Sequence, residues 1–431
     1  MKKKRVSFII YRLAFLKTLG AVIDECLSRG HYVNIIYDAV GKYSKSGKTE
    51  LDQSSFSIFK YGNLNLIPLI DINNLHELIC PITDVLVHQG FPLGYNQNTI
   101  QEIDQYKIIK KKGVPQVGIM SHFYDNCILE LENYEFFDKT CVLSKFSLEA
   151  HQRILLNTCS DKNERVYLKE KIQKVFSNVK ITGSALFDYF NTIYNCSPLR
   201  SKKNIVFFAP KGFGHPFYDL VLYRKSKYYS FIKSILFYNG MYRKQIFHEP
   251  SLVNFLKILY KFSINNNLDL IIKSRPKHKN DIFNKHKSYY TQMIDGSDDS
   301  FYPNYTTADL LQNARLAINT RTFSVLEAVV AGVPAIYFQI PITSKNNAPF
   351  DTELMNEYVK IVRSSSDNSL FNYTGCVWKY SWKESINILN NLKVNDFIQD
   401  PNRRKEYVKY YCGIDERPAA QKQADLIDEF L

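Results

Sequence analysis

Two segments decide the fold of this sequence: LDLIIKSRPKH at residues 268–278 and TADLLQNARLAINTRTFSVLEAVVAGVPAIYF at residues 307–338. The first is an apolar strand that runs directly into a basic loop. The second has a helical period, then a short apolar strand, a hydroxyl-rich loop and another helix. That helix ends at Gly332 and Pro334, because glycine suits the position after a helix and proline cannot continue it. A buried strand, AIYF, follows, and this alternation predicts a parallel α/β sheet.

The loops of these two segments follow strands, so they lie at the carboxyl ends, where open parallel sheets bind ligands. Lys273, Arg275 and His278 offer charge and donors to phosphate oxygens. Thr322 and Ser324 begin a helix, where backbone N–H groups and the helix dipole hold anions. The sequence therefore predicts a phosphate site. The simpler interpretations are a solvated basic loop and a pair of helix N-caps.

The first part of the chain repeats the same alternation. A strand at residues 6–11, a helix at 15–29 with apolar residues at helical spacing, and a strand at 32–37 open it. Further strands are predicted at residues 84–87, 114–120, 140–144 and 179–184, and a helix at 146–156.

Residues 191–203 are polar and separate this set from a new strand at residues 204–210. A chain of 431 residues is also too long for one ordinary core. The sequence therefore predicts an α/β fold with two Rossmann-like domains, at residues 1–190 and 200–390, that face each other across a cleft. Residues 391–431 are predicted to form a helical tail that packs back across the boundary.

The net charge of +14 favours a polyanionic partner or a membrane surface. The simpler interpretation is a solvated lysine-rich surface. Lysine and arginine are dispersed, with no long basic run beyond residues 2–5, and no nucleic-acid-binding motif is present. Nucleic acid is therefore not expected as a partner.

Eight cysteines occur without any C-x-x-C spacing, which favours a reducing cytoplasm. Cys26 and Cys141 lie in apolar runs and are predicted to be core thiols. The N-terminus imitates a signal peptide, but Arg12 and Lys17 interrupt its apolar part, so we expect a first strand there instead. No apolar run is long enough to span a membrane.

Four stretches carry a family resemblance. Residues 179–188 (VKITGSALFD) and, after a linker, 205–210 (IVFFAP) resemble the hinge of GT-B transferases. Residues 271–276 (IIKSRP) occupy the place of a Lys-x-His-Pro loop, with Arg275 where histidine is usual, and residues 309–334 resemble the donor-binding segment. The likeness is closest to bacterial surface-polysaccharide enzymes, the CDP-glycerol glycerophosphotransferase-like, capsule and Kdo transferase group.

This resemblance implies a GT-B glycosyltransferase that moves a sugar from a nucleotide-sugar donor to a lipid-linked or oligosaccharide acceptor. The product would be a bacterial surface glycan, lipopolysaccharide O-antigen or capsule, and the enzyme would act at the inner face of the inner membrane. CMP-Kdo is one candidate donor, because residues 11–17 loosely resemble the Kdo group. The alternatives are polyol-phosphate transfer from CDP-glycerol or CDP-ribitol, UDP-sugar 2-epimerisation, and a non-catalytic polyanion binder.

Three further features concern the donor. Lys211, Gly212 and Gly214 follow a predicted strand and resemble a weak glycine-rich anion cradle, with a tight turn as the simpler interpretation. Glu327 matches a family glutamate that accepts ribose hydroxyls, and otherwise it is a solvated helix residue. The acidic run at residues 295–299 lacks the spacing of a calcium loop and is predicted to be a solvated turn. We expect a metal-independent enzyme.

Glycosyl transfer needs a base for the acceptor hydroxyl or a carboxylate nucleophile. His122 ends a predicted strand, where the resembled group places a histidine, and His88 is its competitor. Asp219, His248 and Glu249 are the other candidates, from the second domain. Glu249 and His122 are preferred, although a structural role is the simpler interpretation of each.

Overall fold

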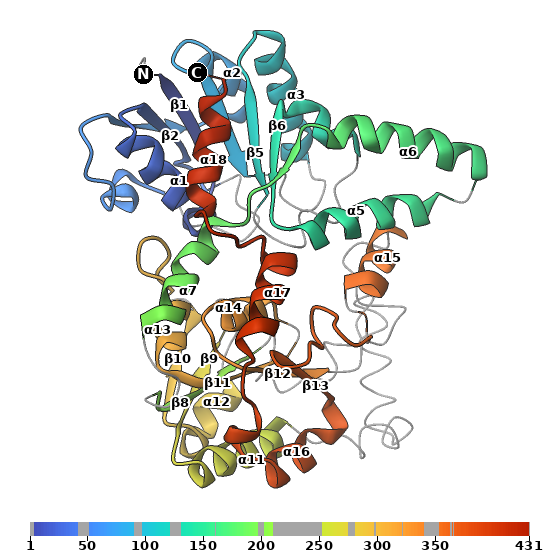
Figure 1. The fold of residues 1–431 in the computed structure, drawn as a ribbon. Helices are drawn as coiled ribbons and strands as arrows, with labels where there is room; N and C mark the ends of the chain where they lie inside the picture. Colours follow the sequence, from blue (N-terminus) through green and yellow to red (C-terminus); the bar gives the residue numbers. More distant parts are fainter. Residues whose placement is uncertain are drawn as a thin grey trace, which may run out of the picture.

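A computed structural model gives the structure of this chain at residues 4–41, 51–89, 97–120, 131–159, 161–196, 202–209, 252–274, 281–296, 299–320, 322–339, 353–362, 364 and 366–430. The described elements form two α/β domains, each built on a parallel sheet and placed one above the other in Figure 1.

The first sheet has seven strands in the order β3-β2-β1-β4-β5-β6-β7, all parallel. Its strands are β1 (Arg5–Ile10), β2 (Tyr32–Asp38), β3 (Leu64–Leu69), β4 (Val85–Gln89), β5 (Gln116–Met120), β6 (Lys139–Val142) and β7 (Val179–Ile181). Its helices are α1 (Leu16–Ser28), α2 (Leu75–Ile79), α3 (Gln97–Lys111), α5 (Lys145–Thr158), α6 (Lys162–Phe176) and α7 (Ala185–Cys196). The strand order reverses at β1, as in doubly wound folds.

The second sheet has six parallel strands in the order β10-β9-β8-β11-β12-β13. They are β8 (Asn204–Phe208), β9 (Asp269–Lys273), β10 (Gln292–Ile294), β11 (Ala314–Asn319), β12 (Ala335–Gln339) and β13 (Val377–Ser381). The helices that follow β8 in the sequence are α11 (Leu252–Asn265), α12 (Asp281–Lys285), α13 (Thr306–Gln312), α14 (Ser324–Val330), α15 (Glu353–Val362), α16 (Ser385–Asn391), α17 (Pro401–Cys412) and α18 (Ala419–Asp428), of which α18 packs on the first domain.

These sheets confirm the predicted α/β class and the two Rossmann-like domains. The helix predicted at residues 15–29 is α1, and the strand that opens the deciding stretch is β9. Central strands such as β1 are buried almost throughout, because helices cover both faces of a parallel sheet. The structure adds β3, β10, β13 and α6, which the sequence patterns do not predict.

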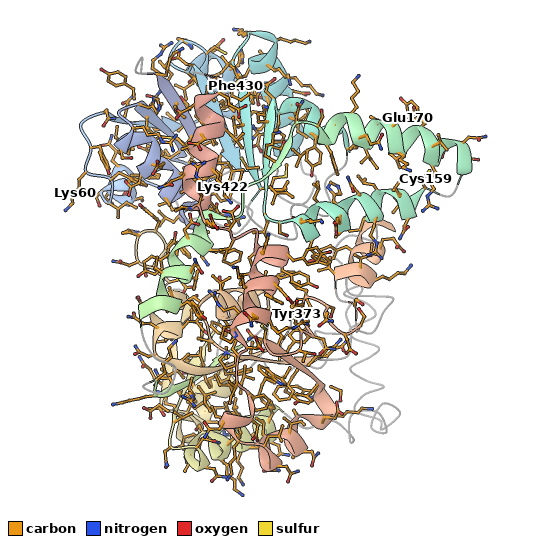
Figure 2. All side chains as sticks on the ribbon, in the orientation of Figure 1. Lys60, Cys159, Glu170, Tyr373, Lys422 and Phe430 are labelled. Carbon is orange, nitrogen blue, oxygen red and sulfur yellow. The ribbon has the colours of Figure 1, made fainter. Side chains whose placement is uncertain are left out.

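The last two helices belong to different domains. α17 packs on α14 of the second domain, whereas α18 lies beside α1 on a face of the first sheet (Figure 1). Figure 2 shows Phe430 at the far end of α18 and Lys422 near the junction between the domains. Ala424 and Ile427 of α18 are fully buried in the first core, so that core is completed by residues near the end of the chain.

Polar contacts fix α18 in this place. Arg29 forms ion pairs with Asp425 at 2.9 Å and Asp428 at 2.6 Å. At the start of the helix, the Asp188 carboxylate accepts hydrogen bonds from the backbone N–H groups of Ala419 (2.8 Å) and Ala420 (2.9 Å). The carboxylate thereby satisfies two donors that a helix N-terminus leaves free.

The chain crosses between the domains where Gly183 and Gly413 touch. Gly413 has a left-handed backbone, with φ of 67°, and a Cβ atom there would lie 2.1 Å from the carbonyl oxygen of Leu143. A side chain at this position would collide with fixed backbone. Glycine therefore allows the two crossing segments to pack against each other.

Arg404 on α17 ties α14 to this junction. Its buried guanidinium donates to the carbonyl oxygens of Val329 (3.1 Å) and Val330 at the end of α14, and to Asn191 Oδ1 on α7 (2.9 Å). It also lies 3.6 Å from the ring centroid of Tyr194. Arg404 thus caps the carbonyl end of α14, where a cation is favoured by the helix dipole.

Asp188 predicts a pH dependence of stability. Burial raises the pKa of its carboxyl from 3.8 to about 6, against the opposing effect of the two N–H donors. The folded state therefore binds a proton on the Asp188 carboxyl more tightly than the unfolded state does. The protonated carboxyl stabilises the folded state below pH 4, and this stabilisation is lost as the pH rises to about 6. We expect the free energy of unfolding to fall by about 3 kcal/mol over this range relative to Asp188→Asn, measured by urea unfolding.

Exposed Asp309 on α13 offers a matched control. Asp309→Asn, which removes one carboxyl group from the surface, is measured in parallel. If the free energy of unfolding of the wild type runs parallel to that of Asp188→Asn over this pH range, the titration of Asp188 does not contribute to the pH dependence of stability.

Cys26 and Cys141 are buried free thiols, as predicted. Among the described residues, no helix combines the length and the apolar composition that crossing a membrane would require.

Candidate functional site

The carboxyl edge of the second sheet brings together the last residues of three neighbouring strands. Asn319 of β11 pairs in register with Phe208 of β8, and Phe208 pairs with Lys273 of β9. The basic loop and the hydroxyl-rich loop predicted from the sequence therefore begin at the same edge. This is where ligands bind in open parallel sheets.

Lys273 forms a buried ion pair with Asp299. The two side chains are only 6% and 13% exposed, and the ammonium also donates to the carbonyl oxygen of Ser274 at 3.2 Å. Asp299 therefore corrects the prediction of a solvated acidic turn, because it is withdrawn from water and paired. A buried pair of this kind is held in place by the penalty for leaving either charge alone.

Glu327, on α14, lies within the electrostatic reach of this pair. Burial raises the pKa of its carboxyl, and the ammonium of Lys17, a hydrogen bond with Ser324 and the ammonium of Lys273 act in the opposite direction. Asp299 adds to the upward shift. Two carboxylates and two ammonium groups thus form one cluster, defined here as the charged cluster: Lys17, Lys273, Asp299 and Glu327.

Lys17 comes from α1 of the first domain, and residues 299–305 hold it near the second. Its ammonium lies 4.8 Å from the ring centroid of Phe301, and its carbonyl oxygen accepts a hydrogen bond from the Tyr305 hydroxyl at 3.2 Å. One turn along α1, a Cβ atom on Gly20 would lie 2.3 Å from the Tyr302 ring. The absent side chain at Gly20 lets this segment approach closely, so the charged cluster spans both domains.

Thr322 and Ser324 lie at the start of α14, as predicted. Their hydroxyl oxygens are 3.0 Å apart, and the Ser324 backbone N–H donates to Thr322 Oγ1 at 3.2 Å. The Ser324 N–H group at the helix start is therefore already hydrogen-bonded to Thr322. Because α14 has only seven residues, side chains rather than its dipole dominate the local chemistry.

Asn319 and Thr320 are two buried polar residues that were not predicted as site residues. Both are fully buried at the end of β11. Within the described part of the chain, neither the Asn319 amide oxygen and nitrogen nor the Thr320 hydroxyl has a hydrogen-bond partner. An unsatisfied buried polar group costs about 1–3 kcal/mol, so such groups mark places with a function to explain them.

Several predicted residues lie outside the described residues. They are the candidate catalytic residues His122, Asp219, His248 and Glu249, and the candidate donor-binding residues Lys211, Gly212, Gly214, Arg275 and His278. Their roles stay predictions.

His88 is a core residue. It is 2% exposed and stacks on Tyr106, with ring centroids 4.2 Å apart, and its Nε2 atom lies 3.3 Å from Gln116 Oε1. Burial lowers the pKa of its imidazole to about 3. Such a group binds a proton too weakly to act as a base near neutral pH. His88 is therefore not supported as the alternative to His122 for the catalytic base.

Lys17, Asp299, Asn319 and Thr320 were missed as site residues. Asn319 and Thr320 are the first two residues of the predicted hydroxyl-rich loop, so their position was a signal that the sequence offered. Lys17 and Asp299 carry no such signal, because only the packing of residues 299–305 on α1 brings them to the site. In the part of the chain that the structure describes, no group of three His, Cys, Asp or Glu side chains could hold a metal ion.

Comparison with protein-family models gives no match, and neither does comparison with curated protein sequences. Solved structures are similar to the fold over nearly the whole chain. A Listeria monocytogenes protein assigned as a UDP-N-acetylglucosamine 2-epimerase matches with a TM-score of 0.55 and 10% identity, covering 99% of this chain and 96% of that one.

The S. aureus protein MnaA, in a structure with UDP, matches with a TM-score of 0.50 and 10% identity over 99% of this chain and 96% of that chain. A variant of the wall teichoic acid polymerase TagF matches with a TM-score of 0.50 and 11% identity over 100% and 89%. These are GT-B proteins, and at such low identity the likeness concerns the fold alone. The chain has the GT-B fold.

Proposed function

We propose that this protein is a glycosyltransferase that binds a nucleotide-sugar at the carboxyl edge of its second sheet and transfers the sugar to a glycan. The observation that carries the proposal is the charged cluster together with two buried polar side chains, Asn319 and Thr320, that have no hydrogen-bond partner among the described residues. A bound donor would supply the hydrogen-bond partners that the described residues do not.

Each part of the site has a task in this proposal. The Glu327 carboxylate accepts hydrogen bonds from the ribose hydroxyls, and the ammonium groups of Lys17 and Lys273 oppose the rise in its pKa that burial causes. Asn319 and Thr320 offer donors and acceptors to the nucleotide. Lys17 reaches the cluster from the first domain, so donor binding stabilises the contact between the domains and aligns donor with acceptor.

Within this proposal, CMP-Kdo stays a candidate donor and a lipid-linked or oligosaccharide acceptor stays the expected partner. The net charge of +14 supports work at an anionic membrane surface, the inner face of the bacterial inner membrane. A metal-independent reaction is part of the proposal. A 2-epimerase is the second candidate, favoured by the fold match to the Listeria monocytogenes protein. CDP-glycerol or CDP-ribitol transfer is the third.

Nucleotide binding tests the proposal directly. A thermal-shift panel with CMP, CDP, UMP, UDP, GDP and ADP should identify one preferred nucleotide, which at about 100 times its dissociation constant adds roughly 2.7 kcal/mol of stability. Glu327→Ala should weaken that binding by about ten- to a hundredfold, because a hydrogen bond to a charged group contributes about 1.5–3 kcal/mol. Exposed Glu170, replaced by Gln, serves as the matched control.

The result separates the candidates. CMP points to a Kdo-type donor, CDP to polyol-phosphate transfer, and UDP or GDP to hexose transfer or epimerisation. Conversion of the nucleotide-sugar without any acceptor would identify an epimerase. If no nucleotide stabilises the protein, or if Glu327→Ala binds as well as wild type, the proposed site is wrong.

A further inference from the structure

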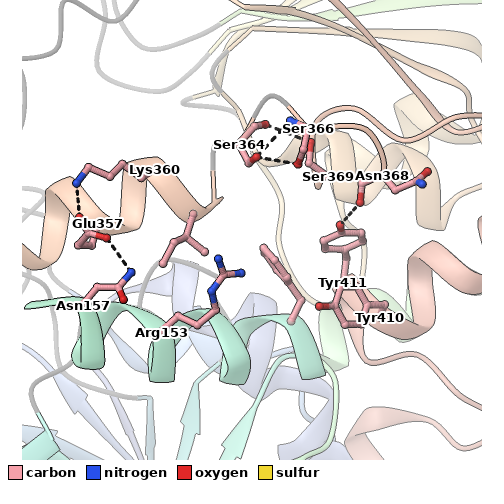
Figure 3. A pocket seen from close by; sticks show the side chains of 12 residues that line it. Arg153, Asn157, Glu357, Lys360, Ser364, Ser366, Asn368, Ser369, Tyr410 and Tyr411 are labelled. Carbon is pink, nitrogen blue, oxygen red and sulfur yellow. Dashed lines mark hydrogen bonds and ion pairs between the residues drawn. The ribbon is translucent and has the colours of Figure 1, made fainter. Parts of the chain in front are cut away.

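A cavity lies between the domains, apart from the charged cluster. It has a volume of about 460 Å³, within the range of small-ligand sites. Figure 3 shows that α5 of the first domain forms one side, while α15, Ser364, residues 366–369 and α17 form the others. None of its lining residues belongs to the charged cluster.

Aromatic rings form one wall of this cavity. The Phe146 ring lies 4.8 Å from that of Tyr411 and 5.6 Å from that of Tyr410, measured between centroids. Hydrogen bonds hold both tyrosines, since the Tyr410 hydroxyl donates to Glu149 at 2.7 Å and the Tyr411 hydroxyl to the carbonyl oxygen of Asn368 at 2.6 Å. The rings are therefore a preformed surface on which an apolar face of a ligand can pack.

Arg153 supplies the charge of the cavity. Its guanidinium extends from α5 into the open space in Figure 3, and within the described chain no ion pair or hydrogen bond engages it. The other cation, Lys360, is paired with Glu357, whose carboxylate also accepts from the Asn157 amide at 3.1 Å. The described lining thus keeps one positive charge for a ligand.

The hydroxyl groups of Ser364, Ser366 and Ser369 line the cavity. Ser364 Oγ lies 2.8 Å from Ser366 Oγ, and Ser369 Oγ donates to the Ser364 carbonyl oxygen at 3.2 Å. Each hydroxyl can both donate and accept hydrogen bonds. Small hydroxyls opposite an aromatic wall match a ligand that has hydroxyls on its edge and an apolar C–H face, which is the chemistry of a sugar ring.

We propose that this cavity binds an acidic saccharide, with its carboxylate or phosphate on Arg153, its ring on Phe146 and Tyr410, and its hydroxyls on Ser364, Ser366 and Ser369. A single unpaired guanidinium forms a two-pronged contact with one such anion. The identification of this saccharide as the acceptor glycan rests on the proposed function; its binding does not.

The cavity walls come from both domains, so an occupied cavity would join α5 to α15 as the Asn157–Glu357 hydrogen bond already does. A glycan bound there would stabilise the domain arrangement in which Lys17 of the first domain lies near Lys273, Asp299 and Glu327. Acceptor binding would thereby favour the state of the protein that binds the donor.

The experiment measures binding of three probes by calorimetry: tri(galacturonic acid), its uncharged methyl ester, and inorganic phosphate. Wild type should bind the acid at least tenfold more tightly than the ester and phosphate. Arg153→Ala should weaken binding of the acid by at least tenfold, and Arg153→Lys by less, because lysine keeps the charge but not the planar fork. Arg165→Ala removes an exposed arginine on α6, outside the cavity, and should change nothing.

A second variant tests the cavity without touching its charge. Ser366→Trp places a bulky side chain at an exposed lining position and should abolish binding of the acid with an unchanged melting temperature. Equal binding of acid and ester, equal binding of phosphate, or wild-type affinity in Arg153→Ala or Ser366→Trp would each overturn the proposal.

The nucleotide panel is run on the same preparations, so the two proposals fail separately. Stabilisation by a nucleotide without binding of the acid rejects only the saccharide site. Binding of the acid by the cavity, with no nucleotide effect, supports the saccharide site and rejects the proposed function. Arg153→Ala should leave nucleotide stabilisation as it is in wild type.

Discussion

Lys273→Met is expected to lower the free energy of unfolding by about 3–5 kcal/mol, because it leaves the Asp299 carboxylate buried without its cation. Glu327 would lose a neighbouring positive charge at the same time, so its carboxyl would hold a proton more tightly. The preferred nucleotide should no longer stabilise the variant. Urea unfolding and the thermal-shift panel measure the two effects separately.

The double variant Lys273→Met/Asp299→Leu distinguishes stability from function. Replacing both partners of a buried ion pair by apolar residues is often neutral, so most of the lost stability should return while nucleotide binding stays weak. Lys257→Met, on the exposed side of α11, is the matched control and should behave as wild type. Nucleotide binding at wild-type strength in the double variant would remove Lys273 from the site.

Arg404→Met should lower the free energy of unfolding by about 3 kcal/mol or more. The variant leaves the carbonyl oxygens of Val329 and Val330 buried without a donor, and a hydrogen bond to a charged group contributes about 1.5–3 kcal/mol. Because these carbonyls end α14, whose first turn carries Glu327, weaker nucleotide binding should accompany the loss. Chemical denaturation with nucleotide titration measures both.

Arg404→Lys is the informative companion variant. Lysine lacks the planar fork that reaches Val329, Val330 and Asn191 together, so we expect only partial rescue. Lys405→Met alters an exposed neighbour on the same helix and should have little effect. Full stability in Arg404→Met would show that the carbonyl end of α14 does not depend on this cap.

The sequence predicted the elements whose apolar pattern is strong. The run at residues 268–272 and the helix ended by Gly332 both occur as expected. β3 was missed because Pro68 interrupts its pattern, yet β3 lies at the edge of the sheet, where a strand can accept proline. α6 was missed because its surface is charged on almost every side and little of it is buried.

The site was predictable only as far as it is continuous in sequence. Lys273, Thr322, Ser324 and Glu327 lie in or beside the two deciding segments, and the structure places all of them at one edge of the second sheet. Lys17 lies more than two hundred and fifty residues before Lys273, and its place depends on the ring of Tyr302, which packs over Gly20 on the same helix as Lys17. When tertiary packing alone brings a side chain to a site, neither the periodicity nor the residue spacing of the sequence predicts it.

The position of α18 has a consequence for the way this protein is made. Ala424 and Ile427 complete the first core, yet a ribosome synthesises them only after the whole second domain. At about 5–20 residues per second, the first domain waits roughly 10–50 s between the emergence of α7 and that of α18. During that time the surface of α1 that α18 will cover stays open to chaperones and to neighbouring nascent chains. Of the two described domains, the one that is translated earlier is therefore completed later.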